Sequence, residues 1–521
     1  MKYHIVTLGC PKNAVDSEGM DGILTGEGHT PAATPAEADL IIVNTCSFIA
    51  AARAETLDVL RTLGETRREG QRIIAAGCMA ESHGDQVAGI PGVDQILSTQ
   101  QWMRIGELVG DRETRGHGDT GTRGHGDTGT RGHGDAGTRG HGDTGTRGHG
   151  GKEYIPLTLV ASGVVAPSPG HPVSLSPRPL VPSSPRPLVP SSPRPLVPSS
   201  QSEPAAGTYT DWRTAQIRRT RRTPSAYLKI SDGCNLHCAF CTIPSFKGTM
   251  ASKPVGAVLG EAQELVTHGV REIVLVAQHL TDYGRDLGMT DGLATLLDAL
   301  CQQLPTQVWV RLMYAYPHGI SERLIEVMAT RPQICKYLDM PLQHAHPDTL
   351  RRMRRPPDTT HTLDLIAALR AAMPDIALRS TFIVGFPGET TAEYRALLTF
   401  LEAAQLDRVG AFRFSQEPGT HAATLPDQVR PQVIEKRWHE LMQLQRRVSI
   451  ARTGRWSGRT LPVLIEGHGS AEGRPLAVGR SFRDAPEIDG QVFVWGQPPV
   501  GTIIPVQITR ATEYDLWGEP A

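Results

Sequence analysis

The chain has 521 residues, with 53 basic and 54 acidic side chains and a formal net charge of −1. This length predicts about three domains, and the balanced charge excludes a global attraction to nucleic acid or to anionic membranes. The start, MKYHIVTLGC, has no apolar stretch of signal-peptide length, and no apolar run near ~18 residues predicts a transmembrane helix. We therefore expect a cytoplasmic protein without a membrane partner. Its eight cysteines do not form a disulfide framework in so long a chain, and clustered cysteines favour metal binding.

Residues 1–110 alternate between strand and helix patterns, which predicts a parallel α/β domain. Three apolar runs each end in a cysteine: HIVTLGC at Cys10, LIIVNTC at Cys46 and RIIAAGC at Cys78. The cysteines are separated by roughly 30 residues or slightly more, the length of one βαβ unit. Because ligands bind at the carboxyl ends of parallel strands, we expect the three thiols to converge and hold a metal cluster. Buried strand-end cysteines without a ligand are the alternative.

Residues 111–208 differ in composition from the rest of the chain. TRGHGDTG recurs with a period of eight from Thr114 to about Gly150, and SPRPLVPS recurs from Ser176 to Ser199. Gly, Pro, Ser and Thr dominate, so little apolar surface offsets the entropy of ordering, and we expect a disordered insertion or linker. Weak metal binding is the alternative, but no octamer holds more than one of the histidines: His117, His125, His133, His141 and His149.

Residues 209–448 again alternate between strands and helices. A helical stretch follows each expected strand, for example Ala392 to Ala404. Six βα repeats predict an open, incomplete parallel barrel with its chemistry at the carboxyl ends of the strands. Residues 449–521 have short apolar runs between Gly and Pro turns and predict a small all-β barrel. The six expected strands of the incomplete barrel are 226–230, 272–277, 308–313, 336–340, 376–384 and 408–414.

The run KISDGCNLHCAFCTIPSFKG carries three cysteines in CxxxCxxC spacing: Cys234, Cys238 and Cys241. It follows the first strand of the incomplete barrel, where that fold places its chemistry. Three thiolates this close together can hold three irons of a four-iron cluster, which leaves one iron open for another ligand. A structural zinc site is the alternative, but zinc takes four ligands and His237 is the one further donor nearby.

With Phe240 before its last cysteine, this motif resembles that of the radical S-adenosylmethionine (SAM) superfamily. The resemblance implies a 4Fe-4S cluster whose open iron binds SAM and whose reduction cleaves SAM to a 5′-deoxyadenosyl radical, while the protein supplies position and excludes water. It also implies that Phe240, Gln343 of PLQHAHP, and Gly385 and Gly388 of FIVGFPGE line the SAM pocket. An ordinary strand-to-helix turn is the alternative for the glycines, and His344 is either a pocket residue or a satisfied buried one.

The whole chain except about 111–208 resembles the methylthiotransferases. The matching runs include LGCPKNAVDSE, VNTCSFI, AAGC, ISDGCNLHCAFCTIP, DMPLQHA, RSTFIVGFPGET, GRSFRDAPEIDG and EYDLWGE. The resemblance implies an auxiliary 4Fe-4S cluster on Cys10, Cys46 and Cys78, and it leaves Cys301 and Cys335 as core residues. The implied domains are a flavodoxin-like methylthiotransferase domain at 1–110, the insertion at 111–208, a radical SAM core at 209–448 and a substrate-recognising TRAM barrel at 449–521.

The family uses two clusters and two molecules of SAM in each turnover. One SAM methylates sulfur associated with the auxiliary cluster. The other yields the radical that takes a hydrogen from the target carbon, to which the methylthio group is then transferred. The resemblance also implies an electron donor of the flavodoxin or ferredoxin type.

Two substrates divide this family: an adenosine of transfer RNA and the β-carbon of an aspartate in ribosomal protein S-twelve. Pro11 in LGCPKN resembles the ribosomal-protein branch, since the transfer-RNA branch usually has Gln there. From Trp456 to Ala521 there are five basic and eight acidic residues, which suits a basic protein better than phosphates. The arginine clusters at 218–222 and 351–355 either face ribosomal RNA or, as we favour, are solvated. We predict the S-twelve enzyme; transfer-RNA methylthiotransferase and a non-catalytic iron-sulfur redox sensor are the alternatives.

Overall fold

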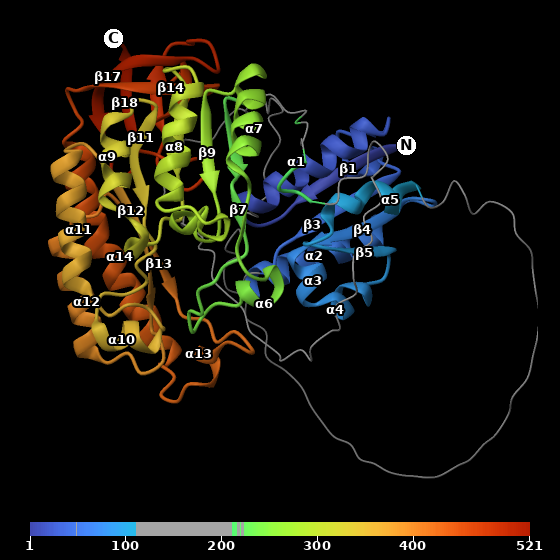
Figure 1. Ribbon diagram of the computed structural model, residues 1–521, viewed down its shortest axis with the longest axis horizontal. Coiled ribbons are helices and arrows are strands. Elements are labelled where there is room, and N and C mark those ends of the chain that lie inside the picture. Colours follow the sequence, from blue (N-terminus) through green and yellow to red (C-terminus); the bar gives the residue numbers. More distant parts are fainter. Residues whose placement is uncertain (48, 111–210, 216–218, 220–222) are drawn as a thin grey trace, which may run out of the picture.

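The computed structural model describes residues 1–47, 49–110, 211–215, 219 and 223–521. Its main sheets define an amino-terminal unit (blue in Figure 1), a larger central unit (green to orange) and a carboxyl-terminal barrel (red) at one end of the central unit. The expected disordered insertion at 111–208 lies outside the described residues. Among the described helices, none is both long and apolar enough to cross a membrane.

The amino-terminal unit is a five-stranded parallel sheet in the order β2-β1-β3-β4-β5. This is the strand order of flavodoxin-like folds, as expected. β3 is buried along its whole length, as is typical of a strand covered on both faces. The strands are β1 (Lys2–Thr7), β2 (Thr30–Pro31), β3 (Leu40–Thr45), β4 (Arg72–Gly77) and β5 (Gln95–Ser98). The helices are α1 (Pro11–Gly26), α2 (Ala50–Thr66), α3 (Cys78–Ser82), α4 (Gly84–Ala88) and α5 (Ile105–Gly110).

The central unit is a six-stranded parallel sheet in the order β13-β12-β11-β10-β9-β6, which confirms the incomplete (βα)6 barrel. Observed and expected strands agree to within about two residues at each end. The strands are β6 (Ser225–Lys229), β9 (Glu272–Val276), β10 (Trp309–Leu312), β11 (Ile334–Asp339), β12 (Ala377–Val384) and β13 (Arg408–Arg413), beside a small antiparallel pair of β7 (Ser231–Asp232) and β8 (Ala251–Ser252). The helices are α6 (Ile243–Lys247), α7 (Val255–Thr267), α8 (Gly292–Gln303), α9 (Glu322–Thr330), α10 (Pro347–Arg352), α11 (Thr359–Ala372), α12 (Thr391–Ala404), α13 (His421–Thr424) and α14 (Pro431–Gly454).

Helix α12 illustrates why these segments fold as they do. Thr390 and Glu393 form a reciprocal capping box at its amino terminus, which satisfies backbone donors that the helix leaves unpaired. Tyr394, Leu397 and Leu401 then recur at intervals of three and four residues and are buried against the sheet.

The carboxyl-terminal unit is a closed barrel in the order β14-β15-β16-β18-β17, as expected for the small all-β part. Its pairings are antiparallel except for β16 with β18. The strands are β14 (Thr460–Ala471), β15 (Arg474–Ser481), β16 (Val492–Trp495), β17 (Ile503–Ala511) and β18 (Leu516–Pro520).

Both flanking units close the inner face of the central sheet. Val15 of α1 and Leu464 and Ala485 of the barrel join one apolar cluster with side chains of β9, β10 and β11. Buried ion pairs reinforce the barrel contact: Glu272 at the start of β9 binds Arg311 at 2.7 Å and also Arg480 of β15. Burial alone would raise the pKa of Glu272, but the two guanidinium groups lower it to about 2. The carboxyl-terminal barrel is therefore fixed to the central unit by charge as well as by apolar contact.

Candidate iron-sulfur and SAM site

The three amino-terminal cysteines lie at one edge of the parallel sheet. Cys10 precedes α1 just beyond β1, Cys46 directly follows β3, and Cys78 begins α3 after β4. The three strands are neighbours, and their last residues are paired in register. Pro11 occupies the first position of α1, where its missing N–H leaves no helical hydrogen bond unmade.

Two glycines allow the loops that carry these cysteines to approach one another. Gly9 has φ +93°, and a Cβ there would lie 2.6 Å from Cys46 Sγ. Gly77 has φ +94°, and a Cβ there would lie 2.3 Å from Asn44 Oδ1. Each glycine stands directly before a cysteine, so LGC and AAGC each contain a backbone conformation that favours glycine as well as a thiol.

Asn13 of α1 connects all three cysteine loops, and the sequence analysis missed it. Its Nδ2 donates to Leu8 O at 2.9 Å and to Thr45 O at 3.1 Å, and its Oδ1 accepts from Cys78 Sγ at 3.7 Å. Asn13 is buried, so its polar groups depend on these partners. The signal that could have revealed it is an amide side chain three residues after Cys10, on the first turn of the helix.

The chemistry of the thiols at this edge of the sheet suits the binding of an iron-sulfur cluster. Burial raises the pKa of the Cys78 thiol to about 11, which the Lys247 ammonium opposes and the nearby Cys10 reinforces. Without a ligand the Cys78 thiol stays protonated; bound iron would stabilise its thiolate form.

The CxxxCxxC cysteines lie in a tight loop after β7. Gly233 begins the loop at φ +79°, where a Cβ would lie 2.2 Å from Thr249 O. The Cys234 backbone N–H donates to Gly248 O at 3.2 Å, and that of Cys241 donates to Cys238 O at 2.9 Å. The loop therefore folds back on itself and holds its three thiols on one side of the central unit.

The thiols of this loop influence one another electrostatically. Burial, reinforced by Cys238 and Cys234, raises the pKa of Cys241 to about 12. The three side chains are buried or half-buried, whereas His237, the fourth donor that a zinc site would need, is exposed. This set of three converging sulfur atoms fits a cluster better than it fits a four-ligand zinc site.

A buried ionic network joins the two cysteine groups. Lys247 Nζ donates to Asp232 at 3.1 Å and to Thr99 Oγ1 at 2.7 Å, and Lys229 binds Asp16 and lies 3.4 Å from Asp232. Burial alone would raise the pKa of Asp232, but Lys247 and Lys229 hold it well below its usual range. Asp232 stands just before the CxxxCxxC loop and Asp16 lies on α1, so these charges fix the amino-terminal unit against the central one.

Two of the residues expected to line the SAM pocket, Phe240 and Gln343, contact β12 or the turn that follows it. Phe240 packs edge-to-face on Phe386, with 6.5 Å between ring centroids. Gln343 bridges to β12: its N–H donates to Thr381 O at 2.8 Å, and its carbonyl accepts from Ile383 N–H at 2.7 Å. A small hollow beside Phe240 is lined by Ile383, Phe412, Arg413, Phe414, Ser415 and Glu417.

Comparison with known proteins identifies the family. The chain matches the family models for "Uncharacterized protein family UPF0004" over residues 2–98, the "Radical SAM superfamily" over 228–401 and the "TRAM domain" over 458–520. A protein of Chloroflexus aurantiacus described as "Ribosomal protein uS12 methylthiotransferase RimO" is 64% identical and aligns over 100% of this chain and 99% of its own length. The chain belongs to the RimO methylthiotransferase family.

A RimO relative from Roseiflexus castenholzii is 58% identical over 100% of this chain and 96% of its own. Among solved structures, the radical SAM methyltransferase TsrM from Kitasatospora setae is 14% identical, with a TM-score of 0.49 over 79% of this chain and 72% of its own. That structural likeness is too weak to carry an argument. Membership of the RimO family confirms the expected transferase class, with SAM and 4Fe-4S clusters as cofactors.

Within this RimO-family chain, Gly385 and Gly388 have conformational reasons to be glycine. Their φ angles are +77° and +75°, and a Cβ on Gly385 would lie 2.3 Å from Ile434 Cγ1. Their place in a SAM pocket stays a prediction.

His344 is buried, but only one of its two ring nitrogens forms a hydrogen bond, so the expectation of a satisfied buried residue is met only in part. Its Nδ1 accepts from the His346 N–H at 2.9 Å, and its Nε2 lies 3.7 Å from Glu389 Oε2. Burial lowers the pKa of His344 to about 3, so the imidazole is neutral. The carboxylate of Glu389 in turn accepts from the N–H of Gly385 at 2.7 Å and holds the FIVGFPGE turn.

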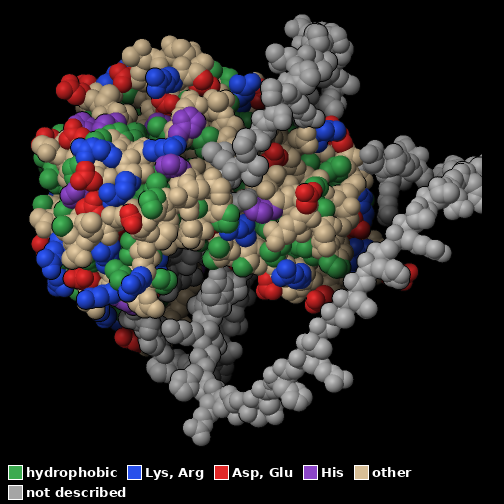
Figure 2. All heavy atoms as spheres, turned by 90° about the horizontal axis from the view of Figure 1, so that it is seen from below, with side chains coloured by type: hydrophobic (Ala, Val, Ile, Leu, Met, Phe, Trp, Pro, Cys, Tyr) green, Lys and Arg blue, Asp and Glu red, His purple; other side chains and the backbone are tan. Residues whose placement is uncertain are grey.

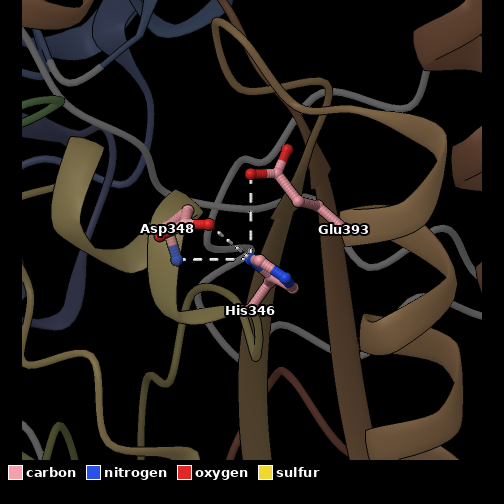
Figure 3. Close-up of side chains that lie close together, drawn as sticks. All are labelled: His346, Asp348 and Glu393. Atoms are coloured by element: carbon pink, nitrogen blue, oxygen red, sulfur yellow. Dashed lines mark hydrogen bonds and ion pairs between the residues drawn. The ribbon is translucent and has the colours of Figure 1, made fainter.

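His346, Asp348 and Glu393 face one another beside α10 and α12 (Figure 3), with ligand atoms within 4.8 Å. Each already has a structural partner. His346 Nδ1 accepts from the Asp348 N–H at 3.2 Å, and Glu393 accepts from the Thr390 N–H at 2.6 Å and from Arg352 at 2.9 Å. His346 and Glu393 serve as helix caps, Asp348 pairs with Arg351, and the adjacent guanidinium groups disfavour a metal ion.

Of the described arginines in the clusters at 218–222 and 351–355, Arg219, Arg352 and Arg355 are buried or half-buried, which corrects the expectation that they are solvated, whereas Arg351 and Arg354 are exposed as expected. Of the first cluster only Arg219 is described; it is buried and pairs with acidic side chains of α1 and α7. In the second, Arg352 and Arg355 bond within the central unit, because carboxylate, carbonyl and sulfur acceptors lie in reach. Figure 2 shows Lys and Arg interspersed with Asp and Glu among the described residues of its face.

Proposed function

We propose that this protein methylthiolates the β-carbon of an aspartate in ribosomal protein uS12. The observation that carries the proposal is the 64% identity, over essentially full length, to a relative described as a uS12 methylthiotransferase. The two cysteine groups support it, because the reaction needs one centre that generates a radical and another that delivers sulfur.

Each cysteine group has a separate role in this proposal. Cys234, Cys238 and Cys241 hold the radical-generating cluster, which when reduced supplies the electron that cleaves SAM. Cys10, Cys46 and Cys78 hold the auxiliary cluster. The convergence of the thiols and the cation beside each group, Lys247 or Arg355, support these ligand sets.

The protein's own side chains position the cofactors and exclude water. Phe240, Gln343, Gly385 and Gly388 border the SAM site in this proposal, with Phe386 packed against Phe240. The buried Lys229–Asp16 pair and the Lys247–Thr99 hydrogen bond hold the two cysteine groups at a fixed separation, which sets where the substrate aspartate must lie.

The charge argument for a protein substrate weakens once the acidic residues of the barrel are placed. Asp484 pairs with Arg408, and Glu466 pairs with Arg480, so neither charge is free for a partner. Asp489 accepts from Tyr337 at 2.7 Å. Sequence identity therefore carries the choice of uS12 over transfer RNA.

Further parts of the proposal concern organisation and partners. We place the domain limits at 1–110, 111–208, 209–448 and 449–521, which enclose the matched regions. The electron donor is a flavodoxin or ferredoxin, and the enzyme acts in the cytoplasm, where its ribosomal substrate resides.

The substrate is tested by incubating anaerobically reconstituted protein with SAM, a reductant and either uS12 or transfer RNA. We expect mass spectrometry to find a methylthio group in place of hydrogen on one uS12 aspartate. A methylthio group on a transfer-RNA adenosine instead would establish the competing enzyme. Absence of 5′-deoxyadenosine under reducing conditions would favour a redox sensor.

Iron content tests the ligand sets. We expect about eight irons per chain, four for each cluster, and about four after Cys10, Cys46 and Cys78 are changed together to Ala. Replacing Cys301 and Cys335 by Ala is the matched control, since both are buried in apolar clusters. If the iron content of the triple Ala variant equals that of the wild type, the auxiliary cluster is ruled out.

A further inference from the structure

Arg355 lies just beyond α10 and places its guanidinium against the CxxxCxxC loop. Its Nη1 donates to Cys238 Sγ at 3.7 Å, and its Nη2 donates to Pro341 O at 2.5 Å. The guanidinium also lies over the ring of Tyr316, 4.3 Å from its centroid. Three contacts therefore hold this cation beside a cysteine sulfur.

The charge of Arg355 acts on the whole cysteine loop. Cys234, Cys238 and Cys241 lie within eight residues of one another, so the guanidinium that contacts the Cys238 sulfur lies beside the whole loop. Among the residues that the structure describes, Arg355 forms no ion pair with a carboxylate, unlike Arg351 with Asp348. Its positive charge is therefore left for the cysteine loop.

An arginine in this position affects the reduction of a cluster. Reduction adds one electron, taken from the donor, and makes the cluster with its thiolates one charge more negative without breaking a bond. A nearby cation and a hydrogen bond to a ligand sulfur stabilise the more negative form and raise the reduction potential. The effect is strong in a half-buried site, where the dielectric screening is weaker than in water.

We propose that Arg355 is a positioning residue that raises the reduction potential of the cluster held by Cys234, Cys238 and Cys241 through its contact with the Cys238 sulfur. The inference rests on the proposed function, which supplies that cluster and its electron donor. In this proposal, Arg355 supplies part of the driving force for electron transfer from the donor to the cluster.

The test compares Arg355→Met, Arg355→Lys and Arg351→Met in the reconstituted full chain. Potentials are measured by redox titration followed by electron paramagnetic resonance, with the relevant signal identified by its change on adding SAM. At the wild-type midpoint, we expect the ratio of reduced to oxidised cluster to fall about tenfold in R355M, equivalent to about 59 mV for one electron. The ratio should fall less in R355K, which keeps the charge. In R351M the ratio should match that of the wild type, since Arg351 is exposed.

An unchanged midpoint in R355M, or an equal fall in R351M, would overturn the proposal. Loss of iron from R355M together with an unshifted R355K would show that the side chain only supports the loop. A further readout separates tuning from structure: 5′-deoxyadenosine formation by R355M should be slow with a weak reductant and recover with a stronger one. If the wild-type protein binds iron and modifies uS12, but the Arg355 variants keep the wild-type reduction potential, only this inference is refuted. Wild-type protein without the cluster would refute the proposed function.

Discussion

Gly385 shows at the scale of one residue how the backbone restricts the sequence. Its φ of +77° lies in the left-handed region, and Ile434 occupies the space where a Cβ would stand. The turn is also held by its N–H, which donates to Glu389. The residue type is therefore decided by conformation and contact together.

Gly385→Ala should lower the stability of the central unit by about 1–3 kcal/mol, because a positive φ and a close contact are both unfavourable for Ala. Thermal unfolding followed by circular dichroism measures the effect. Gly260→Ala is the matched control: Gly260 is exposed inside α7 with nothing near its Cβ position, and the change should stabilise by about 0.5–1 kcal/mol. A G385A midpoint at or above the wild-type value would contradict the argument.

At the scale of elements, hydrogen bonds at the amino terminus of a helix fix the loop that precedes it. α12 begins directly after the FIVGFPGE turn, and its capping box joins Thr390 to Glu393. Glu393 also accepts from Arg352, so this cap connects α12 to α10.

Thr390→Ala should destabilise the central unit by about 1 kcal/mol, since the hydroxyl that accepts the Glu393 N–H at 3.2 Å is lost. The fall in the unfolding midpoint is measured against Thr391→Ala. Thr391 is exposed at the first helical position and makes no capping bond, so its variant should match the wild type. Equal effects of the two changes would mean that the cap contributes nothing.

At the scale of the whole molecule, buried ion pairs decide how the units hold together. Glu272 is fully buried between Arg311 of the central sheet and Arg480 of the carboxyl-terminal barrel. Such a pair gains stability only while both partners are charged.

The stability of this contact should depend on acidity. The pKa of Glu272 is lowered from 4.5 to about 2, so its contribution is present above about pH 4.5 and is lost as the pH falls toward 2. The loss is about 3 kcal/mol. Glu272→Gln should lower the midpoint at neutral pH and flatten its dependence between pH 4.5 and 2, as read from tryptophan fluorescence. Glu472→Gln, at an exposed site of the barrel, should leave the pH profile unchanged.

Deleting residues 114–200 should leave methylthiolation of uS12 largely intact. The segment carries no cysteine and lies between the matched regions that end at residue 98 and begin at 228. Product formation by the deletion variant, measured beside the full chain, checks this. A large loss of turnover would show that the segment takes part in catalysis or substrate binding.

The sequence predicted the strands and the grouping of the cysteines because those features repeat locally. Runs such as LIIVNTC show their burial directly, and the geometry of a parallel sheet brings Cys10, Cys46 and Cys78 to one edge. The partners of single polar residues could not be predicted in this way. Asn13 and Arg355 contact groups from other segments, and the residues next to them in the sequence do not indicate which groups these are.

For Arg219, Arg352 and Arg355 the expectation of a solvated side chain was wrong for a related reason. A run of basic residues usually marks a solvated surface, and only tertiary structure reveals that Arg219 meets Glu18 and Glu261. Ion pairs between segments that are distant in the sequence produce no periodic pattern of residues from which they could be predicted.

The two cysteine groups differ in how much of the protein must exist before they can form. Cys234, Cys238 and Cys241 lie within one short loop and stay close even in a partly folded chain. The other three meet only after β1, β3 and β4 are paired in register. If the two groups bind clusters as proposed, the loop of Cys234, Cys238 and Cys241 can bind iron early in folding, whereas the other group can bind iron only after its strands have paired.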